Sequence, residues 1–152
     1  AAAIHRKMLR QKAEQYSQPV RLRIEAGFFI SGADYLRAQQ ARTLFIRQSK
    51  ELFSDVDLLA GPTVAITAHP IGANQVEVGE AVLGSTVALT QYTRPFNING
   101  FPAITLPCGF STDGLPIGLQ LAGGPFDEMT VLKASHAYEQ ATSWHKKRPP
   151  LD

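Results

Sequence analysis

The sequence has 152 residues, of which 44% are hydrophobic and 18% charged, and its formal net charge is +2. This balance is typical of a globular chain of one domain, and no apolar run approaches the ~20 residues of a membrane-spanning helix. The basic residues are scattered except for the tail at 145–150, so the charge pattern argues against nucleic-acid binding.

Two sequence features exclude further classes of function. A single cysteine rules out an internal disulfide, and the absence of CxxC and HExxH pairs argues against a zinc site, so we expect no metal and no cofactor. The opening AAAIHRKMLRQ lacks the continuous apolar core of a secretory signal. We therefore expect a cytoplasmic protein.

The first third of the chain predicts helices. Apolar residues recur on one helical face over 4–16, and a short helix follows over 19–26. Gly27 is a natural end for it, because glycine accepts positive φ. A third helix is predicted over 31–55, with Ser31 among its candidate N-caps.

The pattern changes to strands and loops in the middle of the chain. Residues 57–60 form a short apolar run before GP, which predicts a buried strand. The span 62–84 has no clear period and predicts a long loop, a feature that is often functional. Residues 86–92 suit a helical turn.

Two alternating segments, 102–110 and 115–123, predict neighbouring strands joined by a tight turn at Gly114. A helix over 126–142 follows, with Asp127 as its N-cap. The sequence therefore predicts an α/β layer architecture. The expected buried stripe of this helix comprises Val131, Leu132, Ala134, Tyr138 and Ala141.

The ionisable and nucleophilic side chains form no complete catalytic constellation. Cys108 follows a proline at the end of an apolar strand, and we interpret it as a small buried hydrophobe rather than a nucleophile. His136 lies in the last helix with Lys133 and Glu139 three residues away on either side, a spacing typical of a solvated helix face. No serine stands in a GxSxG elbow.

Three amides near the proline-rich and glycine-rich segment leave two interpretations open. Asn97, Asn99 and Gln120 can orient a ligand, or they can satisfy backbone groups of the loop. Gln120 lies between Gly118 and Ala122 on one strand face, so either another element packs closely there or Gln120 points at a ligand.

The motifs PFN, GFPAITLPCGF, GLPIGLQL and FDE, in this order between Pro95 and Thr142, resemble the C-terminal part of amidase signature enzymes. The upstream ISGADYLRAQQAR and DLLAGPT and the closing WHKKRPP extend the resemblance over most of the chain. It implies that residues 1–152 are the C-terminal portion of a single amidase domain with a mixed α/β sheet. The N-terminal catalytic half would then be the partner of this chain.

The resemblance also implies which residues act. Family members attack an amide carbonyl with a serine that is activated through a second serine, with a cis peptide, and a lysine, and no position here matches these three. We therefore expect no catalytic residue in this chain. The segment 91–100 would approach the substrate channel and contribute pocket wall. The expected contacts to a small-molecule amide are Thr90, Phe96, Asn97 and Gln120.

Three alternatives remain at this point. The A subunits of glutamine-dependent tRNA amidotransferases resemble the chain in an arginine near Arg23, but they tend to carry an acid about where Thr90 stands. A non-catalytic amide-binding or scaffold protein derived from the fold, and a thiol hydrolase using Cys108, are the others. An open sheet edge would also favour a homodimer.

Overall fold

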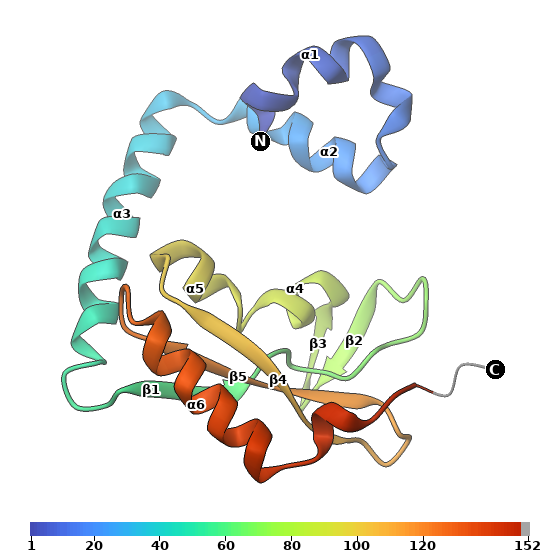
Figure 1. Cartoon of the computed structure of the whole chain (residues 1–152). Coiled ribbons are helices and arrows are strands. Elements are labelled where there is room, and N and C mark those ends of the chain that lie inside the picture. The colour runs from blue at the N-terminus through green and yellow to red at the C-terminus, as the bar shows by residue number, and fades with distance from the viewer. Residues whose placement is uncertain (150–152) are drawn as a thin grey trace. The chain divides into compact units, whose positions relative to one another are not determined.

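The computed structural model describes residues 1–149, which divide into two compact units between Thr43 and Leu44 (Figure 1). We call them the helical unit and the sheet unit. The predicted mixed α/β class is confirmed. Among the described residues, no helix combines the length and the apolar character required to cross a lipid bilayer.

The helical unit pairs two short helices. His5 and Tyr16 tie its first helix to the following turn, because Nδ1 and the phenol oxygen lie 2.9 Å apart and the rings meet edge to face. Ile24 is its buried apolar side chain. The elements are α1 (Ala2–Lys12), a 3₁₀ turn (Ala13–Gln15), α2 (Gln18–Ala26), a second 3₁₀ turn (Gly27–Phe29) and the start of α3 (Gly32–Glu51).

Gly27 ends α2 for a different reason from the one predicted. Its φ is −65°, so it does not use the left-handed region that glycine permits. A Cβ at this position would lie 2.9 Å from the Cβ of Ala2. The glycine therefore allows the first residues of α1 to approach the end of α2.

Ser31 caps α3 as the sequence predicts. Its Oγ accepts a hydrogen bond from the Asp34 backbone N–H at 3.1 Å and donates to Asp34 Oδ2 at 2.6 Å. This reciprocal pair satisfies a backbone donor of the first turn. The helix ends at Glu51, four residues earlier than predicted.

The sheet unit is built on three antiparallel strands in the order β1-β5-β4 (Figure 1). The predicted hairpin of β4 and β5 is confirmed, and Gly114 takes φ of 77° in its turn. Central β5 has Gln120 paired with Gly61 on one side and Thr105 on the other. The strand bounds are β1 (Leu58–Pro62), β4 (Ala103–Phe110) and β5 (Pro116–Gly123).

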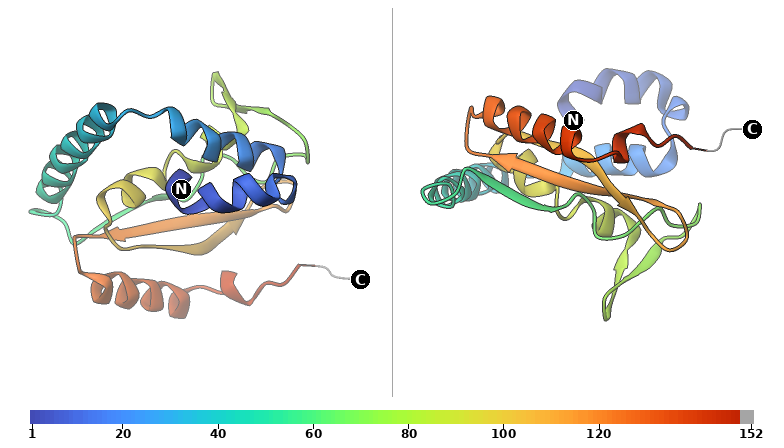
Figure 2. Two further views of the ribbon diagram at one scale, coloured as in Figure 1. Left: turned by 90° about the horizontal axis from the view of Figure 1, so that it is seen from above. Right: turned by 60° about the horizontal axis from the view of Figure 1, so that its bottom comes forward.

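Helices cover both faces of this sheet (Figure 2). On one face α6 (Glu128–Ala141) packs against β4 and β5. Val131 of this helix packs closely on Gly123, since a Cβ built on Gly123 would lie 2.7 Å from Val131 Cγ2. The other face carries the segment with α4 (Ser85–Thr90) and α5 (Arg94–Asn99). Because successive strand residues alternate between faces, Gln120 belongs to this second face.

The predicted loop over 62–84 contains a hairpin, which corrects the sequence prediction. Strands β2 (Gln75–Val78) and β3 (Ala81–Gly84) pair in antiparallel register. A two-residue turn at Gly79, with φ of 60°, connects them. Strands of four residues are too short to show a clear period, which is why the sequence did not reveal them.

The core of the sheet unit is small, and α6 contributes less than its sequence predicts. Val131 and Ser135 are buried, whereas Leu132 is 55% exposed and Ala141 is also exposed. Only a narrow line of this helix meets the sheet. The buried apolar residues of the sheet unit are Ala88, Phe101, Leu106, Leu121, Ala122 and Val131.

Asp127 caps α6, and its loss should destabilise the sheet unit. Its Oδ1 accepts from the Thr130 backbone N–H at 3.4 Å and from the Thr130 hydroxyl at 2.7 Å. We expect Asp127→Ala to lower the free energy of unfolding by about 1 kcal/mol. Urea denaturation measures this change. Asp113→Ala, in the exposed β4–β5 turn, is the matched control, and an equal loss in both variants would contradict the capping role.

Candidate functional site

Two adjoining clefts lie on the face of the sheet that carries α4 and α5. The β1 cleft, of about 250 Å³, lies between residues 59–62 of β1 and the segment 91–96, with Gln120 also in its lining. The β4 cleft, of about 260 Å³, lies between residues 93–97 and the segment 101–105. Phe96 and Gln120 line both clefts. These two side chains therefore separate neighbouring hollows.

Gln120 connects the central strand to the helical segment above it. The side chain is 8% exposed, and its Nε2 donates to the Tyr92 carbonyl at 3.1 Å. A buried amide with a backbone partner holds that segment in register, since leaving either group unpaired costs free energy. The side-chain amide thus satisfies a loop backbone group, one of the two roles left open by the sequence.

Close packing beside Gln120 is also present. A Cβ on Gly118 would lie 2.8 Å from Thr63 Oγ1 and 3.1 Å from Thr105 Cγ2. The two threonine hydroxyls lie 3.1 Å apart across this glycine. A larger residue at position 118 would push the Thr63 and Thr105 hydroxyls apart.

Phe96 and Asn97 belong to α5, whose ends are well defined. Pro95 sits in the first turn, and Gly100 ends the helix with φ of 76°. Asn97 lines the β4 cleft and donates from Nδ2 to the Thr93 carbonyl at 2.9 Å. This hydrogen bond ties the Asn97 side chain to the backbone at the start of its own helix.

Asn99 holds the loop after α5. It is buried, and its Oδ1 accepts from the Phe101 backbone N–H at 2.9 Å. Of the two interpretations open for this amide, the structure favours the backbone role.

Thr90 lines neither cleft. Its hydroxyl donates to the Thr86 carbonyl at 2.6 Å and accepts from Arg94 Nη2 at 2.8 Å. The structure therefore brings Phe96, Asn97 and Gln120 together and places Thr90 to one side. Contact of these four residues with a substrate stays a prediction.

The nucleophile candidates do not assemble into a site within residues 1–149. The Cys108 thiol is half-buried rather than fully buried, and it donates to the Ile117 carbonyl at 3.5 Å. Lys133 and His136 are exposed on α6. In this part of the chain, no three His, Cys, Asp or Glu side chains are grouped as metal ligands would be.

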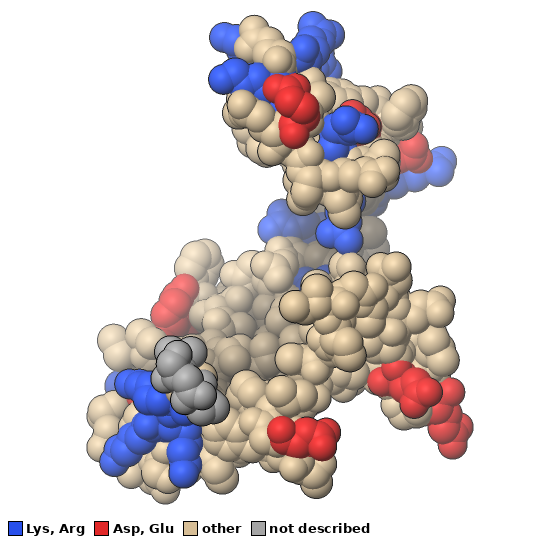
Figure 3. Space-filling view, turned by 90° about the vertical axis from the view of Figure 1, so that its right-hand side faces the viewer, with Lys and Arg blue, Asp and Glu red and all other residues tan. Residues whose placement is uncertain are grey.

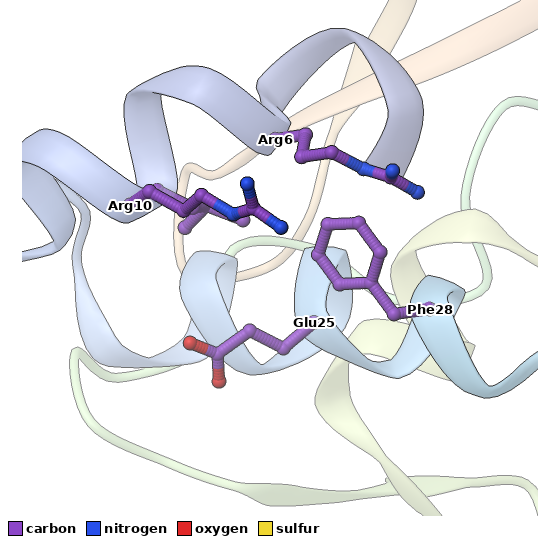
Figure 4. A pocket seen from close by; sticks show the side chains of 5 residues that line it. Arg6, Arg10, Glu25 and Phe28 are labelled. Atoms are coloured by element: carbon purple, nitrogen blue, oxygen red, sulfur yellow. The ribbon is translucent and has the colours of Figure 1, made fainter.

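A separate hollow of about 500 Å³ lies in the helical unit between α1 and α2 (Figure 4). Arg6 and Arg10 line it with Glu25 and Phe28, and the Arg6 guanidinium lies 5.4 Å from the centre of the Phe28 ring. Such a pair contributes about 0.5–1 kcal/mol at an exposed site, which suits a stabilising contact between α1 and the 3₁₀ turn that follows α2. Arg23 of α2 is not part of this lining.

Charged side chains of the sheet unit form small separate groups in Figure 3, with broad uncharged surface between them. Lys146, Lys147 and Arg148 are exposed near the end of the described chain. A backbone-binding nucleic-acid surface needs a continuous basic face, and this view of the unit has none.

Comparison with known proteins identifies the relatives of this chain. The sequence model described as Amidase matches residues 1–132. An amidase from Pseudomonas putida is 41% identical over 152 residues, covering 99% of this chain and 32% of the relative. The A subunit of a glutamyl-tRNA(Gln) amidotransferase from Chloroflexus aggregans is 44% identical over 145 residues, covering 92% of this chain and 28% of that relative.

A solved amidase structure gives the same result for the fold. It superimposes with a TM-score of 0.87 at 30% identity, covering 93% of this chain and 32% of that protein. The chain thus spans about a third of the length of the relatives it matches. On sequence and fold together, the chain belongs to the amidase signature family.

Proposed function

We propose that this chain is the C-terminal part of an amidase that hydrolyses the C–N bond of a small-molecule amide. Its role is to form pocket wall and core, while an N-terminal half supplies the nucleophile. The observation that carries the proposal is the meeting of Phe96 and Gln120 between two clefts on a sheet of amidase-family fold. Both units would belong to one domain that the N-terminal half completes.

The wall is pre-organised, as a binding surface should be. Pro95 fixes φ at the start of α5, and Gly100 ends the helix. Gln120 of the central strand donates a hydrogen bond to the Tyr92 carbonyl, which holds the segment before α5 in place. These restraints reduce the entropy that is lost when a substrate is bound. The segment that carries Phe96 is therefore suited to hold a ligand in one orientation.

The glutamine-dependent tRNA amidotransferase is the second candidate, supported by the 44% identity to the Chloroflexus aggregans protein. Against it, Thr90 is uncharged and cannot pair with the ammonium group of glutamine. Its hydroxyl is already bonded to Thr86 and Arg94. We therefore favour the amidase. A non-catalytic binder is a third candidate, which the following experiment separates from the first two.

The test compares this chain with the parent protein, meaning the polypeptide that joins it to the N-terminal half. We expect a fluorophosphonate probe to label the parent protein and to leave the 152-residue chain unlabelled. Intact mass spectrometry measures the adduct. Heat-denatured parent protein is the control for nonspecific labelling.

Three outcomes would decide against the proposal. Active-site labelling of the 152-residue chain would place a nucleophile within it. A folded parent protein that is neither labelled nor active on amides would favour the non-catalytic binder. Glutamine-dependent amide transfer by the parent protein would favour the amidotransferase.

A further inference from the structure

We propose that the β1 cleft receives an uncharged, apolar group of the amide substrate and rejects a carboxylate at the same position. This inference rests on the proposed function and adds the substrate class. It concerns the face of the substrate that meets this chain, which is distinct from the reacting carbonyl.

The lining of the β1 cleft carries the argument. Its described residues include no Lys, Arg, His, Asp or Glu. Leu59, Pro62, Pro95 and Phe96 supply apolar surface from two sides. The cleft is therefore uncharged as well as concave, a combination typical of pockets that bind apolar groups.

The guanidinium nearest to this lining in sequence has another partner. Arg94 lies between Tyr92 and Phe96 in the chain, yet it is absent from the linings of both clefts. Its Nη2 instead donates to Thr90 Oγ1 at 2.8 Å. A carboxylate in the β1 cleft would therefore not meet this cation.

The amide of Gln120 does not replace the missing cation. Its Nε2 is bonded to the Tyr92 carbonyl, and the side chain is 8% exposed. A carboxylate entering the cleft would lose hydration without gaining a charged partner, and such transfers are strongly unfavourable. A neutral group of the same shape would lose much less.

The volume of the cleft suits a substituted aromatic ring. An apolar cavity of about 150 Å³ is enough to bind benzene, and the β1 cleft measures about 250 Å³. Gly61 adds to this space, because it pairs with Gln120 on the neighbouring strand β5 and nothing lies within 4 Å of a Cβ built on it. A ring with one small substituent therefore matches the available room.

The test uses two amides of the same shape that differ in charge. 4-Nitrobenzamide is neutral, whereas 4-carbamoylbenzoate carries a carboxylate in place of the nitro group. Binding to the parent protein is measured by calorimetry, and turnover by release of ammonia. We expect the neutral amide to be preferred at least about 10-fold in both measurements, because desolvation of the carboxylate is not offset by a charged partner.

A positive charge placed in the lining should largely abolish this preference for the neutral amide. Tyr92 is 40% exposed and contacts Gln120 through its backbone carbonyl, so Tyr92→Lys adds an ammonium group without removing that hydrogen bond. We expect the neutral-to-anionic preference to fall about 10-fold, mainly through KM. Val87→Lys is the matched control, because Val87 is 39% exposed and lines neither cleft.

The outcomes separate this inference from the proposed function. Preferential binding of 4-nitrobenzamide without turnover of either compound would support the inference and contradict the amidase proposal. Equal binding of both amides, binding of neither, or the same selectivity in Tyr92→Lys and the unmodified protein would overturn the inference. A shift of equal size in Val87→Lys would overturn it as well.

Discussion

Gly123→Ala should lower the free energy of unfolding by about 2–3 kcal/mol, the effect expected when a packed core is overfilled. The new Cβ would lie 2.7 Å from Val131 Cγ2 and 3.3 Å from the Asp127 carbonyl oxygen. Val131 is stiff because it is β-branched, and Asp127 belongs to the cap of α6. Neither neighbour can move without shifting the helix away from the sheet. Urea denaturation followed by circular dichroism measures the loss.

A double-mutant cycle tests whether this contact is the cause. Val131→Ala alone should destabilise the protein by leaving a cavity. In the Gly123→Ala background, Val131→Ala removes the methyl group that clashes with the new Cβ. The loss in free energy of unfolding caused by Val131→Ala should therefore be at least about 1 kcal/mol smaller in this background.

Gly61→Ala is the control, because Gly61 is also a strand glycine but nothing lies within 4 Å of its would-be Cβ. We expect its effect on stability to stay within about 0.5 kcal/mol. Additive effects of Gly123→Ala and Val131→Ala would contradict the proposed contact.

Gln120→Met should lower kcat/KM of the parent protein about 100-fold, the scale expected when a positioning contact is lost. The change conserves side-chain length but removes the donor to the Tyr92 carbonyl. Tyr92 and Phe96 would then be free to move, and both belong to the lining of the β1 cleft. The unpaired carbonyl should also cost about 1–3 kcal/mol of stability.

The control for this variant is Gln75→Met, because Gln75 is an exposed residue of strand β2, and this change should leave both quantities unchanged. Hydrolysis of 4-nitrobenzamide and urea denaturation are measured on the same preparations. A Gln120→Met protein with reduced stability but normal kcat/KM would mean that Gln120 supports the fold and not the geometry of the clefts.

Local signals in the sequence predicted several elements correctly. The Ser31 and Asp127 caps form as predicted, since an N-cap depends only on residues within one helical turn. The β4–β5 hairpin was equally local, because a short turn at Gly114 joins two alternating segments. The motifs between Pro95 and Thr142 also indicated the family that the comparisons confirm.

Other elements depended on contacts that the sequence does not display. The β2–β3 hairpin was missed because its strands are only four residues long. Leu132 was predicted to be buried from helical periodicity, but the sheet covers only one narrow side of α6 and leaves it 55% exposed. Gly27 was predicted to take positive φ, whereas its role is to admit Ala2.

The sequence by itself determined the family and the class of fold, because these depend on residue order and local patterns. Only the tertiary structure decided which candidate side chains meet. Phe96 and Gln120 are far apart along the chain, and they adjoin because Gln120 bonds to the Tyr92 carbonyl. Thr90, only six residues before Phe96, lies outside both clefts because its hydroxyl is turned toward Thr86 and Arg94. Sequence separation does not fix such distances, since packing and hydrogen bonds across the sheet determine them.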